Sequence, residues 1–257
     1  MIKKEFVITD DNAKEYISYI SAFIKEKVES ANRKGVILGM SGGLDCSVVA
    51  RLCQEAGVSV KLVMLPDGED MSKTTSMEDS MKLVNEFGFD YRTINIKDIC
   101  DEFENKINET LDVLPKINIR PRVRMTILYS LAQNNSSYVI GTGNLDERLL
   151  GYFTKWGDGA SDLNPLAMLT KGEVRILARH LNVPPPIINK APSAGLFEGQ
   201  TDEAELGFTY PEIDRFILNG TTGNQETDNR LEARIKMSEH KLKPISVYDG
   251  IKRINFL

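Results

Sequence analysis

The chain has 257 residues, of which 41% are hydrophobic and 27% are charged. This composition is ordinary for a globular protein, and the length is sufficient to bury a core without disulfides. The 32 Lys and Arg residues against 37 Asp and Glu residues leave a net charge of −5. A mildly acidic chain argues against a protein that coats nucleic acid, because such binding needs clustered cations, but it does not exclude a local basic pocket for a small anion.

Cysteine usage and hydropathy both predict a cytoplasmic protein. The three cysteines, Cys46, Cys53 and Cys100, are too few and odd in number for a disulfide framework. In a helix, Cys46 and Cys53 would stand roughly 10.5 Å apart, which exceeds the reach of a disulfide. No run of about 18 apolar residues is present, and residues 1–11 contain no apolar run of signal-peptide length. We therefore expect no membrane segment.

The spacing of apolar residues predicts an alternation of helices and strands. Helices are expected at 12–33, from Leu44 to about 56, at 72–87, at 98–113, from Pro121 in a first turn to about Asn135, and at 171–181. Strands are expected at 35–40, 58–65, 91–96 and 138–141, and loops at 151–162 and 184–200. Strands that alternate with helices need crossover connections. We therefore expect one α/β domain over residues 1–257, with a parallel sheet and a helical C-terminal portion, whose strand order the pattern does not reveal.

A glycine-rich turn follows the first predicted strand and opens a helix, with the sequence Gly39-Met-Ser-Gly-Gly-Leu-Asp45-Cys46-Ser47. An open parallel sheet binds its ligands at such a position. Backbone N–H groups of residues 41–43 can point toward one site and form an anion-binding nest at the helix N-terminus. Asp45 would repel a phosphate held there unless a divalent cation bridged them, as magnesium does. The turn therefore predicts a phosphate site with magnesium.

Two common phosphate-binding motifs are absent from the sequence. There is no G-x-x-x-x-G-K-[ST] loop, and Gly141-Thr-Gly143 matches only the first half of G-x-G-x-x-G. The alternative to a nucleotide site is a tight strand-to-helix turn built from small residues.

A second loop, Gly141-Thr142-Gly-Asn-Leu-Asp-Glu147, follows the fourth predicted strand. Thr142 would lie at the carboxyl edge of the sheet, and Glu147 would lie one turn further on, where it could reach the same cation as Asp45. Considered alone, Glu147 could equally be a solvated helix residue.

The turn around Asp45 resembles the pyrophosphate loop of the ATP pyrophosphatases, although position 46, usually Ser in such loops, is Cys here. A thiol is the weaker hydrogen-bond donor to a phosphate. Six further blocks in order resemble the ammonia-dependent NAD synthetases from about residue 12 to residue 244. They are Pro121-Arg-Val-Arg-Met125, Gly151 to Leu166, Leu169-Thr-Lys171, Lys190-Ala-Pro-Ser193-Ala-Gly-Leu, Gln200 to Gly207 and His240-Lys241.

This resemblance implies the fold, the reaction and the roles of individual residues. The fold would be a Rossmann-like open parallel sheet flanked by helices, of the adenine nucleotide alpha-hydrolase type. ATP would adenylate the nicotinate carboxylate of deamido-NAD and release pyrophosphate, and ammonia would then displace AMP. The ATP contacts would be Gly39, Met40, Ser41, Gly42, Gly43, Leu44, Asp45, Cys46, Thr142, Lys171 and Ser193; the magnesium ligands Asp45 and Glu147; and the deamido-NAD contacts Arg122, Lys155, Asp162, His240 and Lys241.

In this reading Asp45, Glu147 and Lys171 act in catalysis, and no protein nucleophile is needed because the substrate's own carboxylate attacks. A Cys–His pair at Cys46 is not expected, since the chain has only two histidines and neither is near it in sequence. The resemblance also implies a homodimer. Arg122 and Arg124 diverge by about 200° on a helix, so only Arg122 is assigned to the ligand. The roles of Arg124, Trp156 and Lys190 stay open.

Three other functions compete with this reading. A tRNA-thiolating ATP pyrophosphatase would want basic patches and often a Cys-x-x-Cys pair, which are absent. A nucleotide-binding regulatory module would not need paired carboxylates and a lysine-bearing loop. A glutamine-dependent synthetase carries a separate nitrilase-like domain of several hundred residues, for which this chain has no room.

Overall fold

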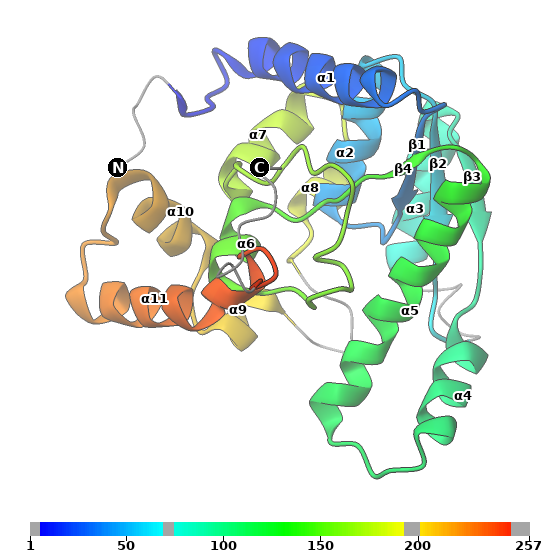
Figure 1. Cartoon of the computed structure of the whole chain (residues 1–257). Coiled ribbons are helices and arrows are strands. Elements are labelled where there is room, and N and C mark those ends of the chain that lie inside the picture. Colours follow the sequence, from blue (N-terminus) through cyan, green and yellow to red (C-terminus); the bar gives the residue numbers. More distant parts are fainter. Residues whose placement is uncertain (1–5, 69–74, 193–200, 248–257) are drawn as a thin grey trace.

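A computed structural model describes residues 6–68, 75–192 and 201–247 (Figure 1). Its elements in chain order are α1 Ala13–Ser30, β1 Val36–Gly39, α2 Leu44–Glu55, β2 Val60–Met64, α3 Thr75–Phe87, β3 Asp90–Thr93, α4 Lys97–Ile107, α5 Val113–Asn134, β4 Tyr138–Val139, α6 Leu145–Leu150, α7 Lys171–His180, α8 Pro185–Asn189, α9 Asp202–Leu206, α10 Tyr210–Asn219, α11 Gln225–Ser238 and the 3-10 turn η3 Glu239–Lys241.

The four strands form one parallel sheet in the order β3-β2-β1-β4, which confirms the predicted α/β fold with a parallel sheet. The chain leaves β1 toward β2 on one side and returns to β4 on the other, so the strand order reverses beside β1. Ligands of open α/β sheets bind at the carboxyl ends of the strands at such a reversal. The loops after β1 and β4 therefore lie next to each other.

The central strand β1 is buried on both faces, and its successive side chains divide between two cores, whereas the edge strand β3 is exposed. Val36 and Leu38 face the core that α1, α2 and α7 cover, whereas Ile37 faces the core that α4 and α5 cover. In Figure 1, α1, α2 and α7 lie on one side of the sheet and the long α5 on the other.

The C-terminal helices form a smaller unit beside α6, as expected for a helical C-terminal portion. A third core joins α6 to α9, α10 and α11. Gly151 ends α6 with a φ of +62°, and a Cβ there would lie 2.3 Å from the Cβ of Ser238 at the end of α11. This close approach brings η3 against the loop that follows α6.

Three predicted boundaries were wrong in the middle and C-terminal parts of the chain. A single helix at 98–113 is instead α4, which ends at Ile107 before the left-handed Asn108, and the start of α5. Pro121 lies inside α5 rather than in a first turn, because eight residues before it already have helical geometry. The predicted loop from 184 contains the short helix α8. The start of the predicted helix at 72–87 lies partly outside the described residues.

Candidate active site

The loop between β1 and α2 is shaped by close contact with α3. Met40 continues the sheet by donating its backbone N–H to the Val63 carbonyl oxygen (2.9 Å). Gly42 then takes a φ of +77°, and a Cβ there would lie 2.0 Å from the carbonyl oxygen of Ser76 in α3. Only glycine meets both conditions, so the sequence at this turn is dictated by its geometry.

The N-terminus of α2 carries no cap from a described side chain. Gly43 is its N-cap residue and makes no side-chain cap bond. The Ser41 hydroxyl accepts the Gly43 N–H (3.3 Å), and the Cys46 thiol donates to the Gly43 carbonyl oxygen (3.2 Å). The thiol therefore bonds within the loop, while the first N–H groups of α2 are available to an anion.

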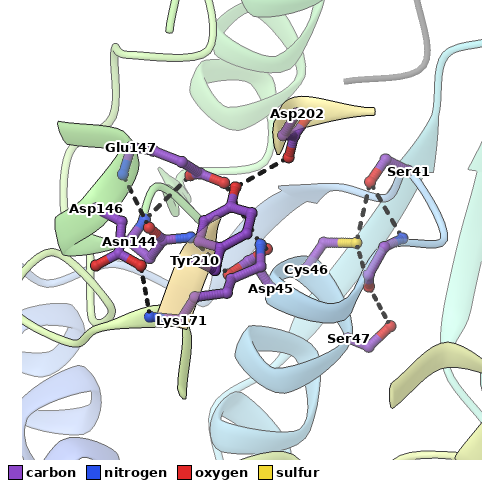
Figure 2. A network of polar contacts seen from close by, with 11 residues as sticks. Ser41, Asp45, Cys46, Ser47, Asn144, Asp146, Glu147, Lys171, Asp202 and Tyr210 are labelled. Atoms are coloured by element: carbon purple, nitrogen blue, oxygen red, sulfur yellow. Dashed lines mark hydrogen bonds and ion pairs between the residues drawn. The ribbon is translucent and has the colours of Figure 1, made fainter. Parts of the chain in front are cut away.

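Three helices bring Asp45, Glu147 and Lys171 to one point (Figure 2). Lys171 Nζ lies 2.5 Å from Asp45 Oδ2 and 3.5 Å from Glu147 Oε1. These residues come from the first turns of α2, α6 and α7, and the Lys171 side chain is only 4% exposed. The sequence predicted that both carboxylates bind one magnesium ion, which stays a prediction; in the structure both lie close to the ammonium group of Lys171.

Asn144 holds the two carboxylates in place, a role that the sequence reasoning missed. Its Nδ2 donates to Asp45 Oδ1 (3.1 Å), and its Oδ1 accepts the Glu147 backbone N–H (3.0 Å). The Asn144 N–H in turn donates to Glu147 Oε2 (3.2 Å). This is a capping box, and the Asn-x-x-Glu spacing was a signal for it in the sequence.

Tyr210 packs beside the ammonium group of Lys171, and the sequence reasoning also missed this residue. Its side chain is fully buried at the start of α10, and Lys171 Nζ lies 5.1 Å from the ring centroid. The Tyr210 hydroxyl donates to Asp202 Oδ2 (2.9 Å). Because α10 meets α7 only in the folded chain, no local sequence pattern could indicate this contact.

Burial and charge act in opposite directions on these ionisable groups. Burial alone would lower the pKa of Lys171, but Asp45 and Glu147 outweigh it and raise that pKa above its ordinary value. Burial raises the pKa of Glu147 to about 8, against the opposing effect of Lys171. Glu147 therefore holds a proton more readily than an ordinary glutamate, even with the Lys171 ammonium group 3.5 Å away.

A second acidic pair lies behind Lys171. Asp146 Oδ2 accepts the backbone N–H of Lys171 (3.0 Å), and Asp214 Oδ2 accepts the backbone N–H of Gly172 (2.9 Å). Burial, followed by the neighbouring charge of Asp214, raises the pKa of Asp146 to about 9. Burial also raises the pKa of Asp214.

Four of the five residues predicted to contact deamido-NAD meet around the loop 151–162. Arg122 Nε donates to the Lys155 carbonyl oxygen (3.3 Å), and Lys155 Nζ donates to the His240 carbonyl oxygen (3.0 Å). Lys241 Nζ donates to the carbonyl oxygens of Gly151 (2.6 Å) and Phe153 (2.8 Å). The result is a group of basic side chains that donate hydrogen bonds to backbone carbonyl oxygens.

The other predicted site residues are placed as follows. Thr142 lines a small hollow with Glu147 and with Phe153, Asp158 and Gly159 of the loop 151–162. Asp162 lies at the edge of the sheet, where its Oδ2 accepts the Val139 N–H (2.7 Å). Ser193 lies outside the described residues.

Arg124 points away from Arg122, as the helical spacing predicted. Its Nε donates to the Leu65 carbonyl oxygen after β2 (3.0 Å). Lys190 pairs with buried Asp79 (3.1 Å), and Trp156 is 61% exposed.

Comparison with known families identifies the chain. Residues 16–245 match the model of the family described as NAD synthase. The chain belongs to the NAD synthase family. An NH(3)-dependent NAD(+) synthetase of Thermococcus sibiricus is 43% identical over 240 residues, with 88% of this chain and 94% of that protein covered. One of Mesoplasma florum is 42% identical, with 89% and 93% covered.

Solved structures support the NAD synthase fold. An NMN synthetase from Francisella tularensis is 35% identical with a TM-score of 0.87, covering 92% of this chain and 98% of that one. An NH3-dependent NAD synthetase from Campylobacter jejuni is 29% identical with a TM-score of 0.78, covering 92% and 99%. The implied fold, a Rossmann-like parallel sheet flanked by helices, is thus confirmed. Among the described residues, no helix is long and apolar enough to cross a membrane.

Proposed function

We propose that this chain makes NAD by ATP-dependent amidation of deamido-NAD with ammonia, releasing AMP and pyrophosphate through an acyl adenylate. The convergence of Asp45, Glu147 and Lys171 beside an uncapped helix N-terminus carries the proposal. Membership of the NAD synthase family supports the same activity. A regulatory module that only bound nucleotide would not need this buried charged centre.

The phosphates of ATP would lie on the loop before α2. Buried Met40 and Leu44 would contribute backbone groups only. Ser41 and Cys46 would contribute a hydroxyl and a thiol close to the phosphates. The full set of proposed ATP contacts is Gly39, Met40, Ser41, Gly42, Gly43, Leu44, Asp45, Cys46, Thr142, Lys171 and Ser193.

Asp45 and Glu147 fit a magnesium site that the substrate completes. Their carboxylates converge beside Lys171 Nζ, which lies 2.5 Å from Asp45 and 3.5 Å from Glu147, and a bound divalent ion would offset the burial that raises the pKa of Glu147. No group of three or more His, Cys, Asp or Glu side chains that could hold a metal occurs among the described residues. Magnesium typically uses one or two carboxylates together with substrate phosphates. When bound there, it would neutralise phosphate charge.

Arg122, Lys155, Asp162, His240 and Lys241 are the proposed contacts of deamido-NAD. The basic side chains gather on one loop and suit an anionic dinucleotide. Asp162 already accepts one backbone N–H through Oδ2, which fixes the orientation of its carboxylate and leaves further acceptor sites for the ligand.

The residues of this chain would bind and orient, and would not attack. The nicotinate carboxylate supplies the nucleophile at the α-phosphorus, and Lys171 would stabilise the negative charge that develops on the departing pyrophosphate. Neutral ammonia would then attack the acyl carbon, and AMP would leave. The thiol of Cys46 has no role in either step, because it is buried and bonded to the loop backbone.

One observation favours a second substrate. The similar Francisella tularensis structure is described as an NMN synthetase. The corresponding acid substrate is nicotinate mononucleotide, which lacks the AMP half of deamido-NAD. Amidation of either compound would use the same carboxylate chemistry.

The test is product formation by the purified chain with ATP, magnesium and ammonium chloride. Deamido-NAD should yield NAD, AMP and pyrophosphate in equal amounts, and ammonia-free glutamine should yield very little. Nicotinate mononucleotide supplied in parallel separates the two substrates. At fixed subsaturating ammonium, the rate should follow free ammonia as the pH rises.

Lys171→Met should nearly abolish turnover, whereas Lys25→Met on exposed α1 should not. Efficient use of glutamine would contradict the proposal.

We also propose a single-domain chain over 1–257 that forms a homodimer in the cytoplasm. Exposed apolar side chains near the ends of α4 and α5 support a partner there; they are Ile99, Phe103, Ile107, Val113 and Leu114. These helices extend away from the rest of the chain in Figure 1. Light scattering should give twice the chain mass, reduced by Leu114→Asp and unchanged by Met237→Asp on exposed α11.

A further inference from the structure

Side chains accept each of the first three backbone N–H groups of α7. Thr170 and Glu173 form a capping box, the same device that begins α10. Glu173 N–H donates to Thr170 Oγ1 (3.3 Å). In addition, Asp146 accepts the N–H of Lys171 and Asp214 accepts the N–H of Gly172, so each of the first three N–H groups has its own side-chain acceptor.

The two added carboxyl groups come from other helices. Asp146 belongs to α6 and directly precedes Glu147. Asp214 belongs to α10, one turn after Tyr210. Glu147 and Tyr210 are themselves neighbours of Lys171 Nζ. The two carboxyl groups therefore tie the helices that surround the lysine side chain to the helix that carries it.

The residue at position 172 leaves room for this arrangement. A Cβ on Gly172 would lie 2.4 Å from Asp214 Oδ2, and real Cβ atoms do not approach so closely. Any larger residue would push the Asp214 carboxyl away from the helix end.

The arrangement is unfavourable for stability considered alone. Asp146 is fully buried, and no N–H group of the described residues donates to its Oδ1 or to that of Asp214, so the pair depends on a proton held between the two carboxyl groups. The two carboxyl groups face each other. Burying poorly satisfied carboxyl oxygens costs free energy. The two carboxyl groups contact the backbone N–H groups of Lys171 and Gly172, so they can fix the position of this backbone.

We infer that Asp146 and Asp214 are positioning residues for the reaction, which hold the backbone of Lys171 so that its ammonium group meets the reacting phosphate. This inference rests on the proposed function of Lys171. Neither carboxyl touches the reacting groups. A shift of about 1 Å in a catalytic group can cost on the order of a hundredfold in rate, so loss of this support should reduce turnover more than binding.

The experiment compares Asp214→Ala with Asp214→Asn in the NAD-forming assay. The alanine removes the acceptor for the Gly172 N–H, whereas the asparagine retains an acceptor oxygen and offers an amide to Asp146. We expect Asp214→Ala to lower kcat at least tenfold with the KM for deamido-NAD within twofold of wild type. Asp214→Asn should restore kcat to within about threefold. The two Asp146 variants should follow the same pattern, with a low kcat in Asp146→Ala and a restored kcat in Asp146→Asn.

Two further variants make the result decisive. Gly172→Ala keeps both carboxyl groups but displaces that of Asp214, so it should also lower kcat, even if Asp214→Ala fails to fold. Asn224→Ala removes the cap of the distant α11 and should leave kcat unchanged. Unchanged kcat in folded Asp214→Ala or in Gly172→Ala would overturn the inference, as would an asparagine variant as slow as the alanine. A wild-type chain that forms no amidated product would instead overturn the proposed function.

Discussion

Asp45 and Glu147 contact the same ammonium group from different helices, so their effects on catalysis should be coupled. We expect Asp45→Asn and Glu147→Gln each to reduce turnover about a hundredfold or more while the fold is retained. The double variant should lose much less than the product of the two, because both side chains serve one cation. Steady-state rates over a range of magnesium concentrations measure this. Near-wild-type turnover in either single variant would contradict the proposal that Asp45 and Glu147 bind magnesium.

Cys46 occupies a position where a hydroxyl would make the same contacts. Its thiol donates to the Gly43 carbonyl oxygen and lies 3.3 Å from the Ser41 hydroxyl. Cys46→Ser should therefore keep activity or raise it modestly, since a hydroxyl is the stronger donor. The kcat of the folded variant provides the measurement. Complete loss of activity would assign the thiol a covalent role that its burial argues against.

At the scale of elements, the loop 151–162 should respond to the second substrate. Trp156, the single tryptophan of the chain, is exposed in a left-handed conformation, and Lys155 Nζ lies 5.5 Å from the centre of its ring. Adding ATP with deamido-NAD should change the tryptophan fluorescence more than ATP alone, because recruitment of Lys155 to the dinucleotide alters the surroundings of the indole. In Lys155→Ala the extra change should be small. An identical response to ATP alone would place the loop outside the dinucleotide site.

At the scale of the whole molecule, stability should fall as the pH rises. Burial raises the pKa of Asp146 from 3.8 to about 9, so the folded chain keeps a proton that the unfolded chain releases above about pH 4. Increasing pH then favours unfolding across this window, by up to about 1.4 kcal/mol per pH unit for one proton. Denaturant unfolding between pH 6 and 9, without nucleotide or divalent cations, tests this. Asp146→Asn should reduce the slope and leave the part that Glu147 contributes, since burial raises the pKa of Glu147 to about 8; an unchanged slope would show that Asp146 is already ionised.

Most elements of the sheet could be predicted from the sequence, because their signals are local. The buried strand before Gly39 and the apolar spacing after Leu44 indicated β1 and α2 at once. The interior position of Pro121 could not be predicted. Proline usually occupies the first turn of a helix, but eight residues of α5 precede Pro121. Its ring is buried against Gly157 of a distant loop. A Cβ added to Gly157 would lie 3.0 Å from the Cβ of Pro121. Packing between distant segments decided that boundary.

The sequence by itself determined the family, the parallel α/β fold and the glycine turn before α2, because glycine spacing and apolar periodicity are properties of neighbouring residues. It also predicted that Asp45 and Glu147 would reach one cation. Only the tertiary structure decided the strand order, the meeting of both carboxylates at Lys171, and the presence of Tyr210 and Asp214 behind it. These contacts join helices far apart in the chain, and they depend on how α6, α7 and α10 pack. No local pattern encodes that packing, because burial of apolar surface is shared among all three helices.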